Sequence, residues 1–154
     1  MIIATLVLAA APKIETLFFV TSDCPISKRY TPEIKRIMNE YNTVSTFKYI
    51  YEDTGTTFEK MKAHHGEYGI KCPLALDPKM ELAKKYSITG VPTVLVKSAK
   101  GEVVYQGRVD DSYGSDFKWH QAKHTDLRNA LRALKEGKPV SVKKTKVIGC
   151  ALSL

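Results

Sequence analysis

Cysteine is scarce in this chain. Its 154 residues include three cysteines, Cys24, Cys72 and Cys150. A small domain held together by disulfides needs a denser set, so we expect the fold to rest on a hydrophobic core. The odd count also leaves at least one thiol outside any intramolecular pair.

Long hydrophobic runs are almost missing as well. The apolar run MIIATLVLAAA occupies residues 1–11, and it is too short to span a bilayer. It ends in small residues, as signal peptides do, but no Lys or Arg precedes Lys13. Residues 1–12 are therefore interpreted as an apolar N-terminal segment, either a signal remnant or an added element of the fold. This segment favours an exported or periplasmic protein over a cytoplasmic one.

The chain contains no repeat, no low-complexity tract and no linker-like stretch. With 44% hydrophobic and 26% charged residues, it fits one soluble domain. We expect that domain to cover residues 13–139 and to be followed by a basic C-terminal tail, residues 140–154. The net charge is +8, but no nucleic-acid motif accompanies it. It therefore predicts a solvated basic face and no nucleic-acid partner, and leaves open a weak contact with an anionic membrane surface.

The hydrophobic pattern predicts alternating strands and helices. Strands are predicted at 16–20, 45–51, 93–97 and 102–105, a short strand or an extended segment at 72–76, and helices at 25–41, 57–65, 79–86 and 119–136. Gly137 is a suitable C-cap for the last helix. This order predicts an α/β domain in which helices cover both faces of a mixed sheet.

A candidate nucleophile lies where the first strand leads into the first helix. The stretch CPISKRYTP begins at Cys24, and Pro25 suits the first turn of a helix. The partial positive charge of a helix N-terminus lowers the pKa of a thiol there, and only the thiolate is nucleophilic. A polar Ser22-Asp23 approach favours a reactive Cys24 over a buried, inert one.

Two separated motifs resemble the thioredoxin superfamily. Pro32 follows Cys24 by eight residues, and the stretch YSITGVPTVLVKSAKGEVV, residues 86–104, is similar to the segment that carries the cis-proline in thioredoxins. The resemblance implies a thioredoxin-like mixed sheet flanked by helices, with an insertion between an N-terminal βαβ unit and a C-terminal ββα unit. It also implies that Pro92 is the cis-proline, that its loop faces Cys24, and that a substrate peptide pairs with the backbone of Val91.

Within the superfamily, the chain is most similar to redoxin-type members, which include peroxiredoxins. Thr21 stands three residues before the cysteine, as in the peroxiredoxin Thr-x-x-Cys, but Leu17 replaces the proline that peroxiredoxins carry. This departure favours disulfides over peroxides as substrates. The resemblance further implies that Thr21 and an arginine, Arg108 ahead of Arg29, tune the thiolate.

The site departs from a thioredoxin dithiol at two positions. Ser27 replaces the second cysteine of Cys-x-x-Cys, and Phe18 stands where thioredoxins keep a buried acid. Another thiol must therefore release Cys24 from its mixed disulfide or sulfenic acid. The internal candidates are Cys150 on the tail and Cys72, for which a structural role is favoured. Glutathione or a partner thiol is the external alternative.

These observations favour a thiol oxidoreductase of thioredoxin fold. Its expected partners are protein or small-molecule thiols and disulfides, with peroxide as a second electrophile. No cofactor or metal is expected. The alternative is a non-catalytic module that binds partner peptides at the cis-proline groove. Copper handling is a third hypothesis, since His120 and His124 are four residues apart on a predicted helix, but the cysteine pair of copper-delivery proteins is absent.

Overall fold

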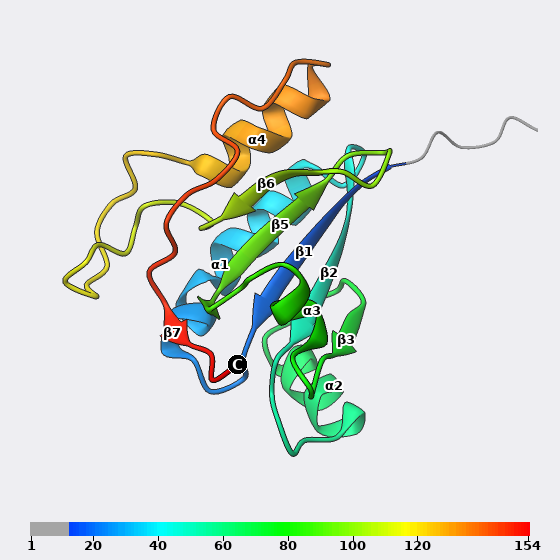
Figure 1. Ribbon diagram of the computed structural model, residues 1–154, viewed down its shortest axis with the longest axis vertical. Coiled ribbons are helices and arrows are strands. Elements are labelled where there is room, and N and C mark those ends of the chain that lie inside the picture. Colours follow the sequence, from blue (N-terminus) through cyan, green and yellow to red (C-terminus); the bar gives the residue numbers. More distant parts are fainter. Residues whose placement is uncertain (1–12) are drawn as a thin grey trace, which may run out of the picture.

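A five-stranded sheet in the order β3-β2-β1-β5-β6 forms the centre of the protein (Figure 1). The structure is a computed structural model and describes residues 13–154, so the expected N-terminal segment, residues 1–12, lies outside the described residues. The elements are β1 (Ile14–Val20), α1 (Pro25–Glu40), β2 (Ser45–Tyr51), α2 (Phe58–Glu67), β3 (Leu74–Leu76), α3 (Glu81–Lys85), β4 (Gly90–Val91), β5 (Thr93–Lys97), β6 (Val103–Gly107), α4 (Asp126–Lys135) and β7 (Cys150–Ala151).

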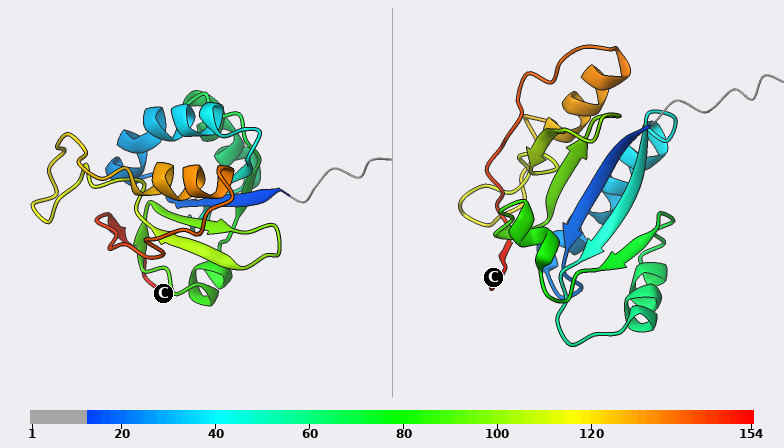
Figure 2. Two further views of the ribbon diagram at one scale, coloured as in Figure 1. Left: turned by 90° about the horizontal axis from the view of Figure 1, so that it is seen from above. Right: turned by 45° about the vertical axis from the view of Figure 1, so that its right-hand side comes forward.

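The sheet is mixed, as the sequence predicts. β1 is parallel to β2 and β2 is parallel to β3, whereas β5 is antiparallel to both β1 and β6. Helices α1 and α4 lie on one face of the sheet and α3 on the other (Figure 2). The predicted α/β class and the order of its units are therefore confirmed. None of the helices within residues 13–154 combines the length and hydrophobicity needed to span a membrane.

The core lies between the sheet and its helices. Phe18 on β1 and Leu95 on β5 are fully buried, as are Ile34 on α1 and Leu131 on α4. Burying each such side chain stabilises the fold by about 1.5–3 kcal/mol, which explains why these apolar periodicities become strands and helices. An ion pair between Arg128 and Glu33, 2.8 Å apart, joins α4 to α1 at the edge of this core.

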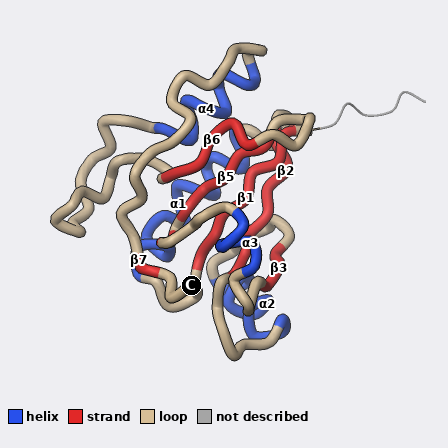
Figure 3. Tube along the Cα trace, viewed as in Figure 1, coloured by secondary structure: helices blue, strands red, loops and turns tan. Residues whose placement is uncertain are grey.

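The predicted helix over residues 119–136 is wrong in its first part, because α4 begins at Asp126. The Asp111 carboxylate accepts hydrogen bonds from the backbone N–H groups of Lys123 and His124, at 2.7 and 2.9 Å. These contacts hold the approach to α4 as a loop (Figure 3). His120 instead contacts Asp116, so His120 and His124 do not share a helical face.

The tail, residues 140–154, lies along the domain instead of extending from it. The backbone N–H of Gln106 donates to the carbonyl of Lys143, and that of Thr145 donates to Gln106. The Thr145 hydroxyl accepts a hydrogen bond from the backbone N–H of Arg108, at 3.0 Å. The tail then continues to β7, which pairs with β4 in a second, two-stranded sheet. Edge pairing along β6 therefore carries the tail toward the start of α1.

Gly107 allows this close approach, and replacing it is expected to displace the tail. A Cβ at position 107 would lie 2.0 Å from the Thr145 hydroxyl oxygen and 2.9 Å from its backbone N and O. We expect Gly107→Ala to lower the free energy of unfolding by about 1–3 kcal/mol, measured by urea denaturation. Hydrogen exchange at the Thr145 amide should accelerate in the same variant. Gly66→Ala is the control, because a Cβ there meets nothing within 4 Å; unchanged exchange at Thr145 in Gly107→Ala would contradict the explanation.

Candidate active site

Cys24 caps the N-terminus of α1. Its backbone N–H donates to the carbonyl of Thr21, and its sulfur accepts the backbone N–H of Ser27 at 3.5 Å. Pro25 occupies the first helical position. The sulfur therefore lies at the positive end of the helix dipole and is contacted by an otherwise unpaired N–H. Both features stabilise a thiolate, as the sequence pattern predicts for this position.

Cys24 forms a disulfide with Cys150 of β7. The Cα atoms are 6.0 Å apart, and the two residues are separated by 126 positions in the sequence. Cys24 is 1% exposed, so the expectation that the polar Ser22-Asp23 approach keeps it from being buried is wrong, because its sulfur is covered by the partly exposed Cys150. Of the candidate partners named from the sequence, the tail cysteine is therefore the one that the fold brings to Cys24.

Cys72 is a free thiol at the other end of the sheet. It precedes β3, whereas Cys24 follows the carboxyl end of β1. Burial raises the pKa of the Cys72 thiol to about 11. A thiol with so high a pKa carries little thiolate at neutral pH, which fits the structural role favoured for it from the sequence.

The loop before β5 faces the disulfide. The Val91–Pro92 peptide bond is cis, and the carbonyl oxygen of Val91 lies 3.6 Å from the Cys24 sulfur. Val91 is the residue opposite Cys150 in the antiparallel β4–β7 pair, and Thr89 accepts a further backbone hydrogen bond from Leu152. The tail thus pairs with the very backbone that the family resemblance assigns to a substrate peptide.

Ser27 occupies the position of the missing second cysteine. Its hydroxyl is buried and has no hydrogen-bond partner among residues 13–154. What Ser27 supplies to the site is its backbone N–H, which points at the Cys24 sulfur. The residue therefore contributes to the electrostatics of Cys24 without contributing a thiol.

Glu52 is a site residue that the sequence reasoning missed. It is 1% exposed, and its carboxylate oxygens have no hydrogen-bond partner among the described residues. Burial, followed by the negative charges of Asp77 and Asp53, raises the pKa of Glu52 to about 8. Glu52 lines an open cleft of about 600 Å³ together with Cys24 and Cys150. It therefore places a buried carboxyl with a raised pKa in the lining of the cleft that holds the disulfide.

The chain topology explains how Glu52 arrives there. β1 and β2 are parallel neighbours, and the Glu52 backbone N–H donates to the carbonyl of Val20 at the end of β1. The residues that follow both strands consequently meet at the same edge of the sheet. Phe18, which occupies the thioredoxin position for a buried acid, packs instead against Phe47 and Tyr49.

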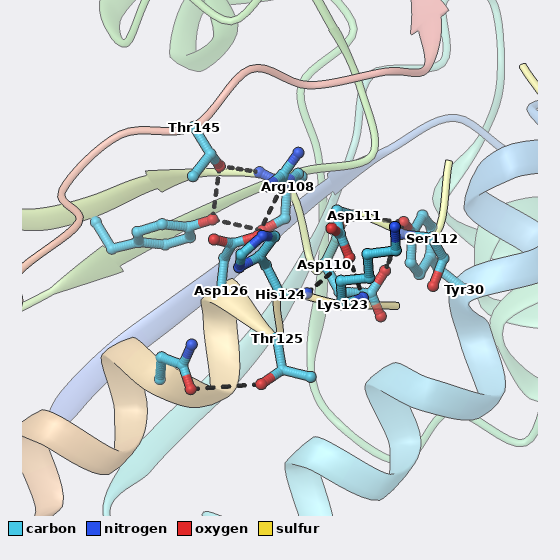
Figure 4. A network of polar contacts seen from close by, with 12 residues as sticks. Tyr30, Arg108, Asp110, Asp111, Ser112, Lys123, His124, Thr125, Asp126 and Thr145 are labelled. Carbon is cyan, nitrogen blue, oxygen red and sulfur yellow. Dashed lines mark hydrogen bonds and ion pairs between the residues drawn. The ribbon is translucent and has the colours of Figure 1, made fainter. Parts of the chain in front are cut away.

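Arg108 contacts helix α4 and the tail. Its Nε–H donates to the Asp126 carboxylate at 2.7 Å, next to Thr145 (Figure 4). The guanidinium of Arg29 lies over the Trp119 ring, 4.9 Å from its centroid. These contacts connect elements of the fold and give no support to the expectation that either arginine tunes the thiolate. Thr21 does line the cleft that contains Cys24, and its backbone carbonyl accepts a hydrogen bond from the Cys24 N–H.

A family model described as thioredoxin-like matches residues 12–103, more than half of the chain. No curated protein sequence matches. The described residues contain no group of three or more His, Cys, Asp and Glu side chains arranged to bind a metal ion.

Solved structures share the fold. An uncharacterised conserved protein of Geobacillus kaustophilus is 27% identical, with a TM-score of 0.81 over 93% of this chain and 78% of its own. A hypothetical protein of Sinorhizobium meliloti is 22% identical, with a TM-score of 0.79 over 92% of this chain and 79% of its own. A secreted disulfide oxidoreductase of Mycobacterium tuberculosis is 21% identical, with a TM-score of 0.51 over 60% of this chain and 66% of its own.

Proposed function

The chain belongs to the thioredoxin-like family, and we propose that it is a thiol-disulfide oxidoreductase with Cys24 as nucleophile and Cys150 as resolving cysteine. The observation that carries this proposal is the Cys24–Cys150 disulfide at the N-terminus of α1, opposite the cis-proline loop. Similarity to a secreted disulfide oxidoreductase is consistent with it. The mechanism needs no Cys-x-x-Cys motif, because the tail supplies the second sulfur.

The proposed reaction transfers two electrons from the dithiol to a substrate disulfide. The Cys24 thiolate attacks one substrate sulfur, the substrate S–S bond breaks, and the other substrate sulfur leaves as a thiolate. The Cys150 thiolate then attacks the Cys24 sulfur. The mixed disulfide breaks, the second substrate thiolate leaves, and the Cys24–Cys150 bond forms. The substrate is reduced to two thiols and the protein is oxidised to its disulfide.

In this mechanism, Glu52 exchanges the proton of Cys150. A free cysteine has a pKa of about 8.5, and the pKa of Glu52 is raised to about 8. Proton transfer between groups of similar pKa is close to balanced in both directions, which suits a step that must run forward and backward. The ionised Glu52 accepts the thiol proton before Cys150 attacks, and the protonated form returns it when the disulfide is reduced.

Reaction with oxidised glutathione tests this proposal. We expect the reduced protein, given one equivalent, to lose two thiols and to yield a peptide pair linked through Cys24 and Cys150, identified by mass spectrometry. The single remaining thiol should be Cys72. Cys72→Ser should form the same link at the same rate, because the pKa of Cys72 is raised to about 11. A Cys24→Ser variant that consumes oxidised glutathione as fast as the natural sequence would show that Cys24 is not the nucleophile.

We also propose that the protein works outside the cytoplasm. Disulfides persist in oxidising compartments, and one neighbour of the same fold is a secreted protein. The Cys24–Cys150 pair is compatible with such a compartment. Fractionation of cells that produce the full chain would locate it, and recovery in the cytoplasmic fraction alone would contradict the assignment.

A further inference from the structure

The end of the tail binds the domain as a peptide would. Residues 148–152, Ile-Gly-Cys-Ala-Leu, run antiparallel to the cis-proline loop. Cys150 lies opposite Val91, Ala151 lies opposite Gly90, and the Leu152 N–H donates to the carbonyl of Thr89 at 2.9 Å. The groove formed by residues 89–92 is thus occupied by a segment whose cysteine is bonded to Cys24. The side chains that fit at each position of this segment therefore indicate which peptide sequences the groove can bind.

The groove restricts the side chain of the residue before the cysteine most strictly. A Cβ at position 149 would lie 2.0 Å from the carbonyl oxygen of Val91, 2.7 Å from its carbonyl carbon and 3.3 Å from the nitrogen of Pro92. All three atoms belong to the backbone of the groove, so no side-chain rotation relieves the overlap. Only glycine fits at this position without moving the loop that carries the cis-proline.

The groove restricts the side chains of the two residues after the cysteine less strictly. Ala151 is exposed, so the groove leaves space for other side chains there. Leu152 is partly buried and packs against the hydrophobic core. The fit of the tail therefore defines a pattern with glycine before the cysteine, any residue after it, and an aliphatic residue next.

We propose that the protein partner of this site presents its reactive cysteine directly after a glycine, in an extended segment of the form Gly-Cys-x-aliphatic. This inference rests on the proposed function, because it assigns the substrate class of Cys24. The tail occupies the groove in the disulfide form. Reduction of the Cys24–Cys150 bond removes the covalent link, and the partner segment then takes the place of the tail.

The covalent step with the partner is the first attack of the proposed reaction. The Cys24 thiolate attacks the sulfur of the partner cysteine within the partner's disulfide. That disulfide breaks, and its distal sulfur leaves as a thiolate. The glycine lets the partner backbone approach Val91 closely enough to place its cysteine in line with Cys24.

Peptide disulfides test the pattern on the full-length Cys150→Ser variant, in which Cys24 has no internal partner. Two peptides are used: KVIGCALS, the sequence of residues 146–153, and the same peptide with alanine in place of glycine. Each carries 5-thio-2-nitrobenzoate on its cysteine, and attack by Cys24 releases the coloured thiolate. The glycine peptide should react about 5- to 150-fold faster, since the overlap of an added Cβ in a packed site costs on the order of 1–3 kcal/mol.

A second variant removes competition from the protein's own tail. Gly149→Ala combined with Cys150→Ser should react faster with the glycine peptide than Cys150→Ser alone, because a tail with alanine in place of Gly149 no longer fits the groove. Thermal melting establishes that both variants are folded. Equal rates for the two peptides in both variants would overturn the glycine requirement.

Failure of the proposed function gives a different result. The mixed disulfide of glutathione with 5-thio-2-nitrobenzoate needs no groove and reports the reactivity of Cys24 alone. If it reacts no faster with the folded Cys150→Ser variant than with the same variant in guanidinium chloride, Cys24 is not an activated nucleophile. If it reacts fast while the two peptides do not differ, Cys24 is the nucleophile and the partner pattern is wrong.

Discussion

Replacing Cys150 with serine is expected to preserve the first chemical step and to abolish turnover. Cys24 retains its position at the N-terminus of α1 and its contact with the Ser27 N–H. It should therefore still attack a disulfide substrate such as insulin. Without the second sulfur, however, the mixed disulfide at Cys24 can be released only by an external thiol. We expect steady-state reduction of insulin, with dithiothreitol as reductant, to fall by at least about 100-fold, because an oriented intramolecular thiol acts at a high effective concentration.

The mixed disulfide itself is the decisive readout. Intact mass of Cys150→Ser, after mixing with oxidised glutathione and acid quenching, should show one glutathione bound at Cys24. Cys72→Ser should retain full turnover, which controls for the loss of a thiol as such. Turnover by Cys150→Ser at the rate of the natural sequence would mean that the Cys24–Cys150 disulfide lies outside the catalytic cycle.

Glu52→Gln is expected to slow the reaction and to stabilise the protein. Glutamine has nearly the shape of glutamate but cannot exchange a proton. Since positioned acid–base groups contribute typically about 10²–10⁴ in rate, we expect a loss of about 100-fold in the second step, formation of the Cys24–Cys150 bond from the mixed disulfide. The rise of that rate with pH, which in the natural sequence includes ionisation of Glu52 at about 8, should in this variant follow ionisation of the Cys150 thiol alone, for which a free cysteine has a pKa of about 8.5. Rapid-quench measurement of the two steps separates this effect from any change in the first attack.

The stability effect follows from the same raised pKa. The unfolded chain releases the Glu52 proton near the ordinary value of 4.5, whereas the folded protein retains it up to about 8. Between these values the folded state binds more protons than the unfolded state. The free energy of unfolding should therefore fall as the pH rises, with a contribution from Glu52 of about 1.4 kcal/mol per pH unit. Denaturation at pH 5, 6.5 and 8 should show that Glu52→Gln lacks this contribution, while Glu59→Gln, an exposed substitution on α2, retains it.

The sequence predicts the strands and helix that hold Cys24 and Pro92 better than it predicts the residues that join them from distant segments. The strand before Cys24, the helix that Cys24 caps and the hairpin after Pro92 are each determined by local patterns, and they occur as predicted. A short apolar run predicts a buried strand, and a proline after a capping residue predicts the start of a helix. Both patterns involve only a few neighbouring residues, so they can be recognised without the fold.

Glu52 and the tail depend on contacts between distant segments. Glu52 reaches Cys24 because β2 pairs in parallel with β1, and the register of that pairing is a tertiary property. β4 and β7 have two residues each. This is too short for the alternation of apolar and polar residues that identifies a strand in a sequence. Gly107 and Gly149 lie where a Cβ would overlap another backbone. Without the fold, nothing distinguishes these two glycines from ordinary loop glycines.

The missed start of α4 has a similar cause. Residues 119–125 have helical spacing with the residues that follow, but the Asp111 carboxylate accepts the backbone N–H groups of Lys123 and His124 before a helix can. A side chain that competes for backbone donors overrides local periodicity.

In the proposed reaction, the long loop that the disulfide closes makes the folded dithiol form a stronger reductant. The disulfide closes a loop over 126 residues, and in the chain-entropy treatment such a crosslink disfavours the unfolded state by about 5 kcal/mol. By thermodynamic linkage, a folded dithiol gains that same free energy when it becomes oxidised, relative to an unstructured pair of thiols. In the proposed reaction, the packing of the sheet and tail thereby adds to the free energy that drives reduction of the substrate, and a variant that loosens this packing should be a weaker reductant.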